Sequence, residues 1–327
     1  MRRREVLSLL GGALVSWPHL ANAQYVDRLH EIGVLIALSE NDPDVPPRIA
    51  NFEQGLRELG WFKGRNILIH YRFAASPEQL KVHARELALM QPDLIVAGSG
   101  MVVSALRQES TTVPIVFVTA VNPVANGYVA ALQRPGGNLT GFTNNSPSMG
   151  GKWLELLKQV APSITRVAIM FNRDANSASY FVPTIEAAAA SNGVRPIVVS
   201  VRSPTEIETA FAELGGPAQG LVIIPDSFMI RHRALVIEQA ARFKVPAIYP
   251  ARYYATEGGL MSCGADMLDL YRRVPSYVDR ILRGSKPADL PVQSPSKVDL
   301  VINLRAAEAL GLSVPRIVIA RANEVIE

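Results

Sequence analysis

Short apolar runs alternate with longer amphipathic segments along most of the chain. Runs such as Leu94–Ala97 and Val167–Phe171 are apolar at every position, which indicates strands that are buried on both faces. The segments between the runs repeat apolar residues at helical spacing. Because strands and helices alternate regularly, the pattern predicts right-handed crossovers and a doubly wound α/β fold with parallel sheets.

The pattern also gives an approximate range for each element. The predicted strands are Ile32–Leu38, Asn66–Tyr71, Leu94–Ala97, Ile115–Thr119, Leu139–Phe142, Val167–Phe171, Pro196–Val201, Gly220–Ile224, Ala247–Tyr249 and Val298–Ile302, with a further short strand among residues 258–264. The predicted helices are Pro47–Leu59, Pro77–Met90, Met101–Glu109, Pro123–Gln133, Ser148–Val160, Ser179–Ser191, Thr205–Leu214, Met229–Phe243, Met267–Arg283 and Leu304–Leu310.

These strands are too many for one open sheet, and we expect two similar α/β lobes. A joint rich in Gly, Asn and Ser, Asn138–Gly151, lies near the middle of the chain. The expected division is residues 28–141 plus 265–292 for lobe 1, and 142–264 plus 293–327 for lobe 2. Because late segments return to lobe 1, several strands would connect the lobes and form a hinge.

The N-terminus has the pattern of a secretory signal peptide. Three arginines, Arg2 to Arg4, precede the mostly apolar run Val6–Trp17, and the small-residue site Ala21-Asn22-Ala23 follows. The run is shorter than the roughly 20 residues that span a bilayer. The arginines also resemble the twin-arginine export signal. A buried N-terminal strand is the alternative, but we expect cleavage of residues 1–23, after Ala23, and a periplasmic mature chain without a lipid anchor.

Composition excludes several classes of protein. Removal of the signal, with three Arg and one Glu, lowers the formal net charge from +4 to about +2, which is too weak for a nucleic-acid partner. Cys263 is the single cysteine, so no internal disulfide forms. Beyond the signal, no apolar run is long enough to cross a membrane.

Catalytic and cofactor motifs are missing from the sequence. There is no P-loop, no H-E-x-x-H and no Gly-x-Ser-x-Gly elbow, and the histidines lack metal-ligand spacing. His232, between Arg231 and Arg233, is expected on a solvated helix face. A dinucleotide fingerprint begins at Gly98, but its third glycine is replaced by Val103. We therefore expect neither catalysis nor a metal or cofactor.

Ligands of open α/β sheets bind beyond the carboxyl ends of the strands. The candidate binding residues at these ends are Ser39, Ser99, Gly100, Met101, Asn122, Asn172, Asp226 and Tyr249. The Ser99 hydroxyl and the N–H groups of Gly100 and Met101 open a helix, where a carboxylate is favoured. Asp226 is expected to accept hydrogen bonds from an ammonium group, and Tyr249 to supply an aromatic wall.

Each polar residue also has a plainer interpretation. Ser99 can act as the N-cap of its own helix, and Asp226 as the N-cap of the helix at Met229. Both interpretations stay open for both residues at this point.

Four motifs resemble a known family. Pro135–Gly141 (PGGNLTG), Gly284–Val292 (GSKPADLPV), Val301–Leu304 (VINL) and Ala309–Leu312 (ALGL) are similar to segments of a family of ABC-transporter substrate-binding proteins. The resemblance implies the type I periplasmic-binding-protein fold, with two doubly wound lobes joined by three crossovers. It also implies capture of a small ligand between the lobes and delivery to the transmembrane subunits of an ABC permease.

The better understood members of that family bind aromatic or other amino acids, so we expect an amino acid or another carboxylate-bearing ligand. We also expect a monomeric protein. Three residues depart from the family pattern. Asn122 replaces a common Asp, Cys263 replaces a common Tyr, and Pro275 interrupts a helix that it should kink. The first two are expected near the cleft.

Alternatives of other classes remain at this point. A sugar- or nucleoside-binding protein of the same fold would stack rings on aromatics, for which Tyr249, Tyr253 and Tyr254 are available. An exported α/β enzyme would need a nucleophile and a base, and a transcriptional regulator would need an N-terminal helix-turn-helix.

Overall fold

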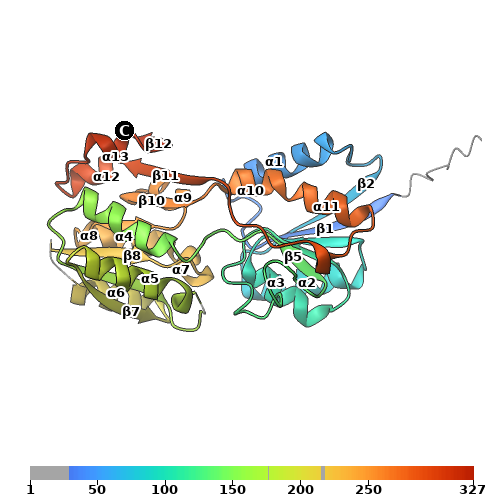
Figure 1. Ribbon diagram of the computed structural model, residues 1–327, viewed down its shortest axis with the longest axis horizontal. Coiled ribbons are helices and arrows are strands. Elements are labelled where there is room, and N and C mark those ends of the chain that lie inside the picture. Colours follow the sequence, from blue (N-terminus) through green and yellow to red (C-terminus); the bar gives the residue numbers. More distant parts are fainter. Residues whose placement is uncertain (1–28, 176, 215–217) are drawn as a thin grey trace, which may run out of the picture.

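The computed structural model describes residues 29–175, 177–214 and 218–327. It consists of two α/β lobes that lie side by side, each a sheet with helices on both faces (Figure 1). The predicted signal peptide, Met1–Ala23, lies outside the described residues. The fold is the doubly wound α/β class expected from the sequence.

The first lobe contains a five-stranded sheet of order β2-β1-β3-β4-β5 in which every pairing is parallel. Its strands are β1 (His30–Ile36), β2 (Ile67–Phe73), β3 (Leu94–Ala97), β4 (Ile115–Phe117) and β5 (Leu139–Gly141). Its helices are α1 (Val45–Glu58), α2 (Pro77–Leu89), α3 (Gly100–Glu109), α10 (Met267–Arg273) and α11 (Pro275–Leu282). Helices α1, α10 and α11 pack on one face of the sheet, and α2 and α3 on the other.

The second lobe contains a seven-stranded sheet of order β12-β11-β10-β9-β8-β6-β7, parallel except between β10 and β11. Its strands are β6 (Arg166–Asn172), β7 (Arg195–Val201), β8 (Gln219–Ile223), β9 (Ala247–Tyr249), β10 (Met261–Ala265), β11 (Val298–Asn303) and β12 (Glu324–Ile326). Its helices are α4 (Met149–Val160), α5 (Ala178–Ser191), α6 (Pro204–Leu214), α7 (Ser227–Arg231), α8 (Arg233–Arg242), α9 (Arg252–Thr256), α12 (Leu304–Ala309) and α13 (Arg316–Ile319).

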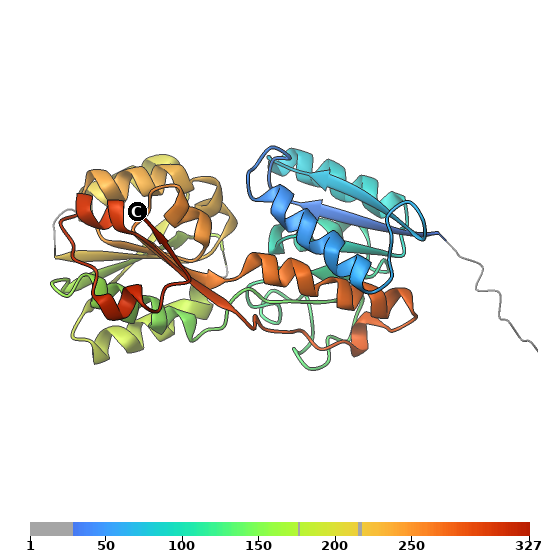
Figure 2. The same ribbon diagram turned by 90° about the horizontal axis from the view of Figure 1, so that it is seen from above.

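The described chain passes between the lobes three times, after β5, after β10 and before β11. Two of these crossovers are joined by hydrogen bonds. Phe142 and Gln293 form a parallel bridge, and the Thr143 N–H donates to the Gln293 carbonyl at 2.8 Å. Figure 2 shows the crossovers running together through the narrow connection between the two lobes.

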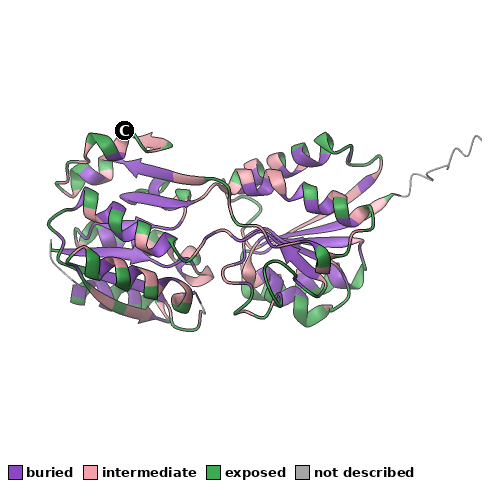
Figure 3. Ribbon diagram, in the orientation of Figure 1, coloured by how far each residue is buried: buried purple, intermediate pink, exposed green. Residues whose placement is uncertain are grey.

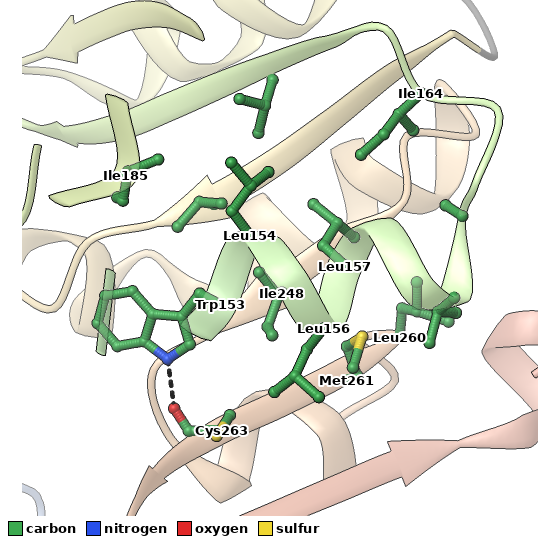
Figure 4. Packing of buried hydrophobic residues seen from close by; sticks show 14 of the residues in the cluster. Trp153, Leu154, Leu156, Leu157, Ile164, Ile185, Ile248, Leu260, Met261 and Cys263 are labelled. Atoms are coloured by element: carbon green, nitrogen blue, oxygen red, sulfur yellow. Dashed lines mark hydrogen bonds between the residues drawn. The ribbon is translucent and has the colours of Figure 1, made fainter. Parts of the chain in front are cut away.

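Most residues of the central strands are buried between the helices on the two faces of each sheet, and exposed residues lie on the outer sides of the helices (Figure 3). The second-lobe core is built around Trp153 of α4. Its indole N–H donates to the Cys263 carbonyl on β10 at 2.6 Å (Figure 4). Burial raises the pKa of the Cys263 thiol to about 11, so Cys263 acts as a small core residue.

One predicted helix is wrong. Residues 123–133 form turns, because the single turn that begins at Pro123 ends at Gly127, whose φ is +65°. The Tyr128 N–H then closes the turn on the Pro123 carbonyl at 2.8 Å. Further along, the Leu132 carbonyl accepts a hydrogen bond from the Val292 N–H at 2.7 Å, outside any helix.

Two other predicted helices are divided. Residues 267–282 break into α10 and α11 at Pro275, as expected from the missing proline N–H. The predicted helix Met229–Phe243 divides into α7 and α8 at His232, whose ring packs on Phe228 with centroids 4.4 Å apart. Helices α9 and α13 and strand β12 were not predicted.

Candidate functional site

The carboxyl ends of the strands of both sheets point toward the gap between the lobes, where two adjoining cavities lie. The more enclosed one, here called the inner cavity, has a volume of about 280 Å³. The second, the outer cavity, has a volume of about 690 Å³. The residues that line both are Leu80, Ser99, Met101, Thr119, Asn144, Pro225, Ser227, Ile230 and Arg231.

The inner cavity combines an apolar wall with charged groups. Its larger apolar residues are Ile36, Leu38, Leu80, Met101, Ile230 and Met267, and Tyr253 supplies an aromatic ring. Its charged residues are Asp42, Asp44, Arg48, Arg231 and Arg233. Charges of both signs in an apolar chamber suit a ligand that carries both signs itself.

Arg48 of α1 is the most buried of these charged residues, with 7% of its surface exposed. Its Nη2 donates to Asp44 Oδ2 at 2.9 Å, one helical turn away. Its guanidinium also lies 5.9 Å from the ring centre of Tyr271 on α10. Because a buried charge is tolerated only with such partners, Arg48 and Asp44 form a fixed pair at the cavity wall.

Two arginines of the second lobe reach across to the first. The Arg233 Nη2 donates to Asp42 Oδ2 at 3.5 Å, while its Nε donates to both carboxylate oxygens of Glu257 at 2.8 and 2.9 Å. Its guanidinium also lies 5.4 Å from the ring centre of Tyr253. Arg231 Nη1 lies 3.5 Å from the sulfur of Met101 on α3. The lobes therefore contact each other on two sides of the cavities.

Ser99 occupies the N-cap position of α3, but its side chain makes no capping hydrogen bond. Its Oγ is buried and has no partner among the described residues. The same holds for the Oδ1 atoms of Asn144 and Asn145 in the first crossover, and Asn145 is only 2% exposed. Buried polar atoms are normally hydrogen-bonded, so these three atoms, all in cavity-lining residues, are available to a ligand. Ser99 is therefore the N-cap of α3 by position, but its hydroxyl does not cap the helix.

The capping interpretation of Asp226 is confirmed. Its Oδ1 accepts from the Met229 N–H and its Oδ2 from the Asn172 N–H, both at 2.8 Å. Burial raises the pKa of the Asp226 carboxyl, against the lowering effect of these donors. Asp226 and Asn172 both line the outer cavity, so the carboxylate has a structural role in a place where a ligand could also reach it.

The other predicted residues fall into two groups. Ser39 lines the inner cavity, Gly100 the outer cavity and Met101 both. Tyr249 and Asn122 line neither, which corrects the expectation for both.

The reasons differ. Tyr249 is 1% exposed and stacks on Tyr254, with ring centroids 4.8 Å apart, because its side chain points from β9 into the second-lobe core. Tyr253, on the following helix α9, lines the cavity in its place. Asn122 has a φ of +44°, and its Oδ1 accepts from the Ala125 N–H at 3.3 Å within a turn.

Sequence reasoning missed Asp42, Arg48, Arg231 and Arg233 as cleft residues. The arginines lie on helices, where charged residues are normally solvated, and no sequence signal separated them from surface arginines. Asn144 and Asn145 had a signal, since they lie in the joint Asn138–Gly151, but the joint was interpreted only as a connection.

Two absences apply to the described residues 29–175, 177–214 and 218–327. They contain no cluster of His, Cys, Asp or Glu side chains that could hold a metal ion. None of the helices within them has the length and apolar character that crossing a membrane requires.

Residues 31–326 match the model of a family described as ABC transporter substrate binding protein. The chain belongs to this family. The resemblance of the four motifs is thereby confirmed. A curated relative, a tyrosine-binding protein of Clostridioides difficile (strain R20291), is 25% identical over 83% of this chain and 78% of its own length.

Solved structures of similar proteins cover nearly the whole of this substrate-binding protein. A conserved domain protein of Vibrio cholerae is 26% identical with a TM-score of 0.82, over 91% of this chain and 100% of that one. An ABC domain of Streptococcus pneumonia in complex with L-Trp is 24% identical with a TM-score of 0.82, over the same shares of the two chains. The second likeness concerns the fold alone.

None of the three departures from the family pattern supplies a residue that lines either cavity. Cys263 pairs with Leu300 in the β10–β11 ladder and is buried in the core, and Asn122 lies in its turn. Neither side chain lines a cavity, although Val121 and Asn126 beside Asn122 line the outer one. Pro275 marks the break between α10 and α11.

Proposed function

We propose that this substrate-binding protein captures a free amino acid between its lobes, with an aromatic amino acid as the first candidate, and delivers it to an ABC permease. One observation carries the proposal: the unpartnered Ser99 hydroxyl at the start of α3 lines a cavity with an apolar wall and charges of both signs. The tyrosine-binding relative, at 25% identity, supports the choice of an aromatic amino acid.

The parts of an amino acid match different parts of the cleft. The Ser99 hydroxyl and the N–H groups of Gly100 and Met101 suit the carboxylate. Two acceptors suit the ammonium group: the Asp226 carboxylate, which lines the outer cavity, and the Asn144 Oδ1 atom, in a residue that lines both cavities. The side group then enters the inner cavity, against Tyr253 and the apolar wall.

Capture requires the lobes to move about their crossovers. We propose residues 28–141 plus 265–292 and residues 142–264 plus 293–327 as the two moving units. The ion pair between Asp42 and Arg233 forms across the gap and closes one side of it. In this proposal the chain is exported to the periplasm, where the closed, monomeric protein presents its ligand to the permease.

Ligand screening of the mature chain, beginning at Gln24, tests the proposal. Calorimetry and thermal shift are measured with L-tyrosine, L-tryptophan, L-leucine, D-galactose and adenosine. A ligand at 100 times its Kd stabilises the folded state by about 2.7 kcal/mol. We expect stabilisation by L-tyrosine or L-tryptophan. Binding of only the sugar or the nucleoside would overturn the proposal.

A serine substitution tests the carboxylate position. Ser99→Ala should weaken amino-acid binding about tenfold, the value of a hydrogen bond to a charged group. It should leave the unliganded melting temperature nearly unchanged, because the Ser99 Oγ has no partner to lose. Ser191→Ala is the control, since that hydroxyl lies on α5 and donates to the Ala187 carbonyl. Unchanged affinity in Ser99→Ala would contradict the carboxylate position.

A further inference from the structure

Arg231 is the last residue of α7 and extends from the second lobe toward the first turn of α3. Its Nη1 lies 3.5 Å from the Met101 sulfur, and Arg231 lines both cavities. Ser99 lines both cavities together with Arg231, and Gly100 lines the outer one; these residues begin α3, where backbone N–H groups carry partial positive charge. A cation of one lobe thus shares the cavities with the N-terminal residues of α3 in the other.

Arg231 differs from the other arginines of the cavities in its partners. Arg48 is paired with Asp44, and Arg233 is paired with Asp42 and Glu257. Within the described part of the chain, no ion pair includes Arg231.

The acidic side chains of the cavities are already engaged elsewhere. Asp226 accepts two backbone N–H groups, and Asp174 is paired with Arg202 at 2.9 Å. Asp42 and Asp44 hold Arg233 and Arg48. Asp226 and Glu78 lie near enough for electrostatic attraction to Arg231, yet neither forms an ion pair with its guanidinium within the described residues. The guanidinium therefore has room to bind the carboxylate of a ligand.

The neighbouring polar atoms also lack partners. The Ser99 Oγ is buried and unpartnered, and the Asn145 Oδ1 is unpartnered in a residue that is 2% exposed. Both residues line the inner cavity together with Arg231. A hydroxyl donor, a guanidinium and amide oxygen acceptors together suit a ligand that bears an anion and a hydrogen-bond donor.

We propose that Arg231 clamps the carboxylate of the ligand from the second lobe, while Ser99 and the α3 N-terminus hold it from the first. This inference rests on the proposed capture of an amino acid and adds a residue that selects for the free acid. A planar guanidinium can hold a carboxylate through two parallel hydrogen bonds. The carboxylate then connects the two lobes, so a ligand without it gains less from closure.

A thermodynamic cycle between protein and ligand tests the clamp. Calorimetry compares the parent chain with Arg231→Gln, using L-tyrosine and L-tyrosinamide, and L-tryptophan and L-tryptophanamide. The amides keep the ammonium group and the ring but lose the negative charge. Arg231→Gln should weaken binding of the free acids about tenfold and that of the amides less than about twofold.

Two further variants make the result specific. Arg242→Gln removes the same charge at the end of α8, where the guanidinium lies over Phe243 outside both cavities, and should change neither affinity. Arg231→Lys keeps the charge without the planar fork and should recover part of the loss. Arg231 is exposed, so an unchanged melting temperature of the unliganded variant shows that it is folded.

The outcomes separate the two proposals. If Arg231→Gln binds the free acids as the parent does, or loses acids and amides equally, the clamp is wrong while amino-acid capture stands. If the parent chain binds neither L-tyrosine nor L-tryptophan, capture of an aromatic amino acid fails and the clamp fails with it.

Discussion

Asp226→Ala is the substitution whose consequence changes most once the structure is known. From the sequence, the binding interpretation places its effect on the ligand, whereas the capping interpretation places it on stability. In the structure the carboxylate also caps α7 through the Met229 N–H and fixes the end of β6 through the Asn172 N–H. Alanine removes both acceptors at once, so the unliganded protein must lose stability.

The magnitude follows from the two hydrogen bonds. Loss of an aspartate N-cap costs about 1 kcal/mol, and a partly buried N–H left without a partner costs about 1–2 kcal/mol. Burial raises the pKa of the Asp226 carboxyl, so the charged form is partly destabilised in the folded protein. Removal of that buried charge offsets part of the loss in stability. A net loss of about 2 kcal/mol lowers the melting temperature by about 4–8 °C for a unit of 150–250 residues.

The assay is thermal unfolding of parent, Asp226→Ala and Asp226→Asn without ligand. The Asn variant keeps one acceptor oxygen and should lose about half as much. Since the pKa of the Asp226 carboxyl is raised on folding, its contribution to stability is fully present below its ordinary value and declines as pH rises through the folded value. The alanine penalty should therefore be larger at acid pH than at neutral pH. A melting temperature within about 1 °C of the parent would refute the reasoning.

Three further predictions follow from packing, burial and the N-terminus. In a urea titration, Gly264→Ala should destabilise the chain strongly, because a Cβ there would lie 1.9 Å from the Pro250 carbonyl oxygen. Gly137→Ala is the control and should be tolerated, because a Cβ there would have no atom within 4 Å. Iodoacetamide should modify Cys263 in the folded protein far more slowly than in urea at pH 8, since the thiol is buried and its pKa is about 11; equal rates would contradict this. N-terminal sequencing of periplasmic material should begin at Gln24, and an intact N-terminus would count against cleavage after Ala23.

Much of the fold could be predicted because burial on both faces leaves a clear pattern in the sequence. Leu94–Ala97 and Ala247–Tyr249 are the observed β3 and β9 without any change of bounds. The turns at 123–133 could not be predicted from apolar spacing, since the left-handed conformation of Gly127 ends the helical turn. Strand β12 has three residues and depends on pairing with β11, a contact that has no local signal.

The candidate site could be predicted only as far as strand topology determines it. Ser99, Asn172 and Asp226 line the cavities because the carboxyl ends of parallel strands meet at one edge of each sheet. Tyr249 was wrong because strand side chains alternate between faces, and its own side chain points into the core. Arg48 and Arg231 needed the packing of helices against the gap between the lobes, which spacing along the chain does not contain.

The crossovers also determine the order in which the molecule can be completed during synthesis. Helices α10 and α11 are made after β10 of the second lobe, yet Tyr271 and Tyr277 are buried with Phe52 in the core of the first. Until the ribosome has passed residue 282, α1 covers that face of the first sheet without α10 and α11. The second sheet in turn waits for β11 and β12. Neither lobe can fold to completion as an emerging N-terminal piece, so both reach their final stability together in the last part of translation.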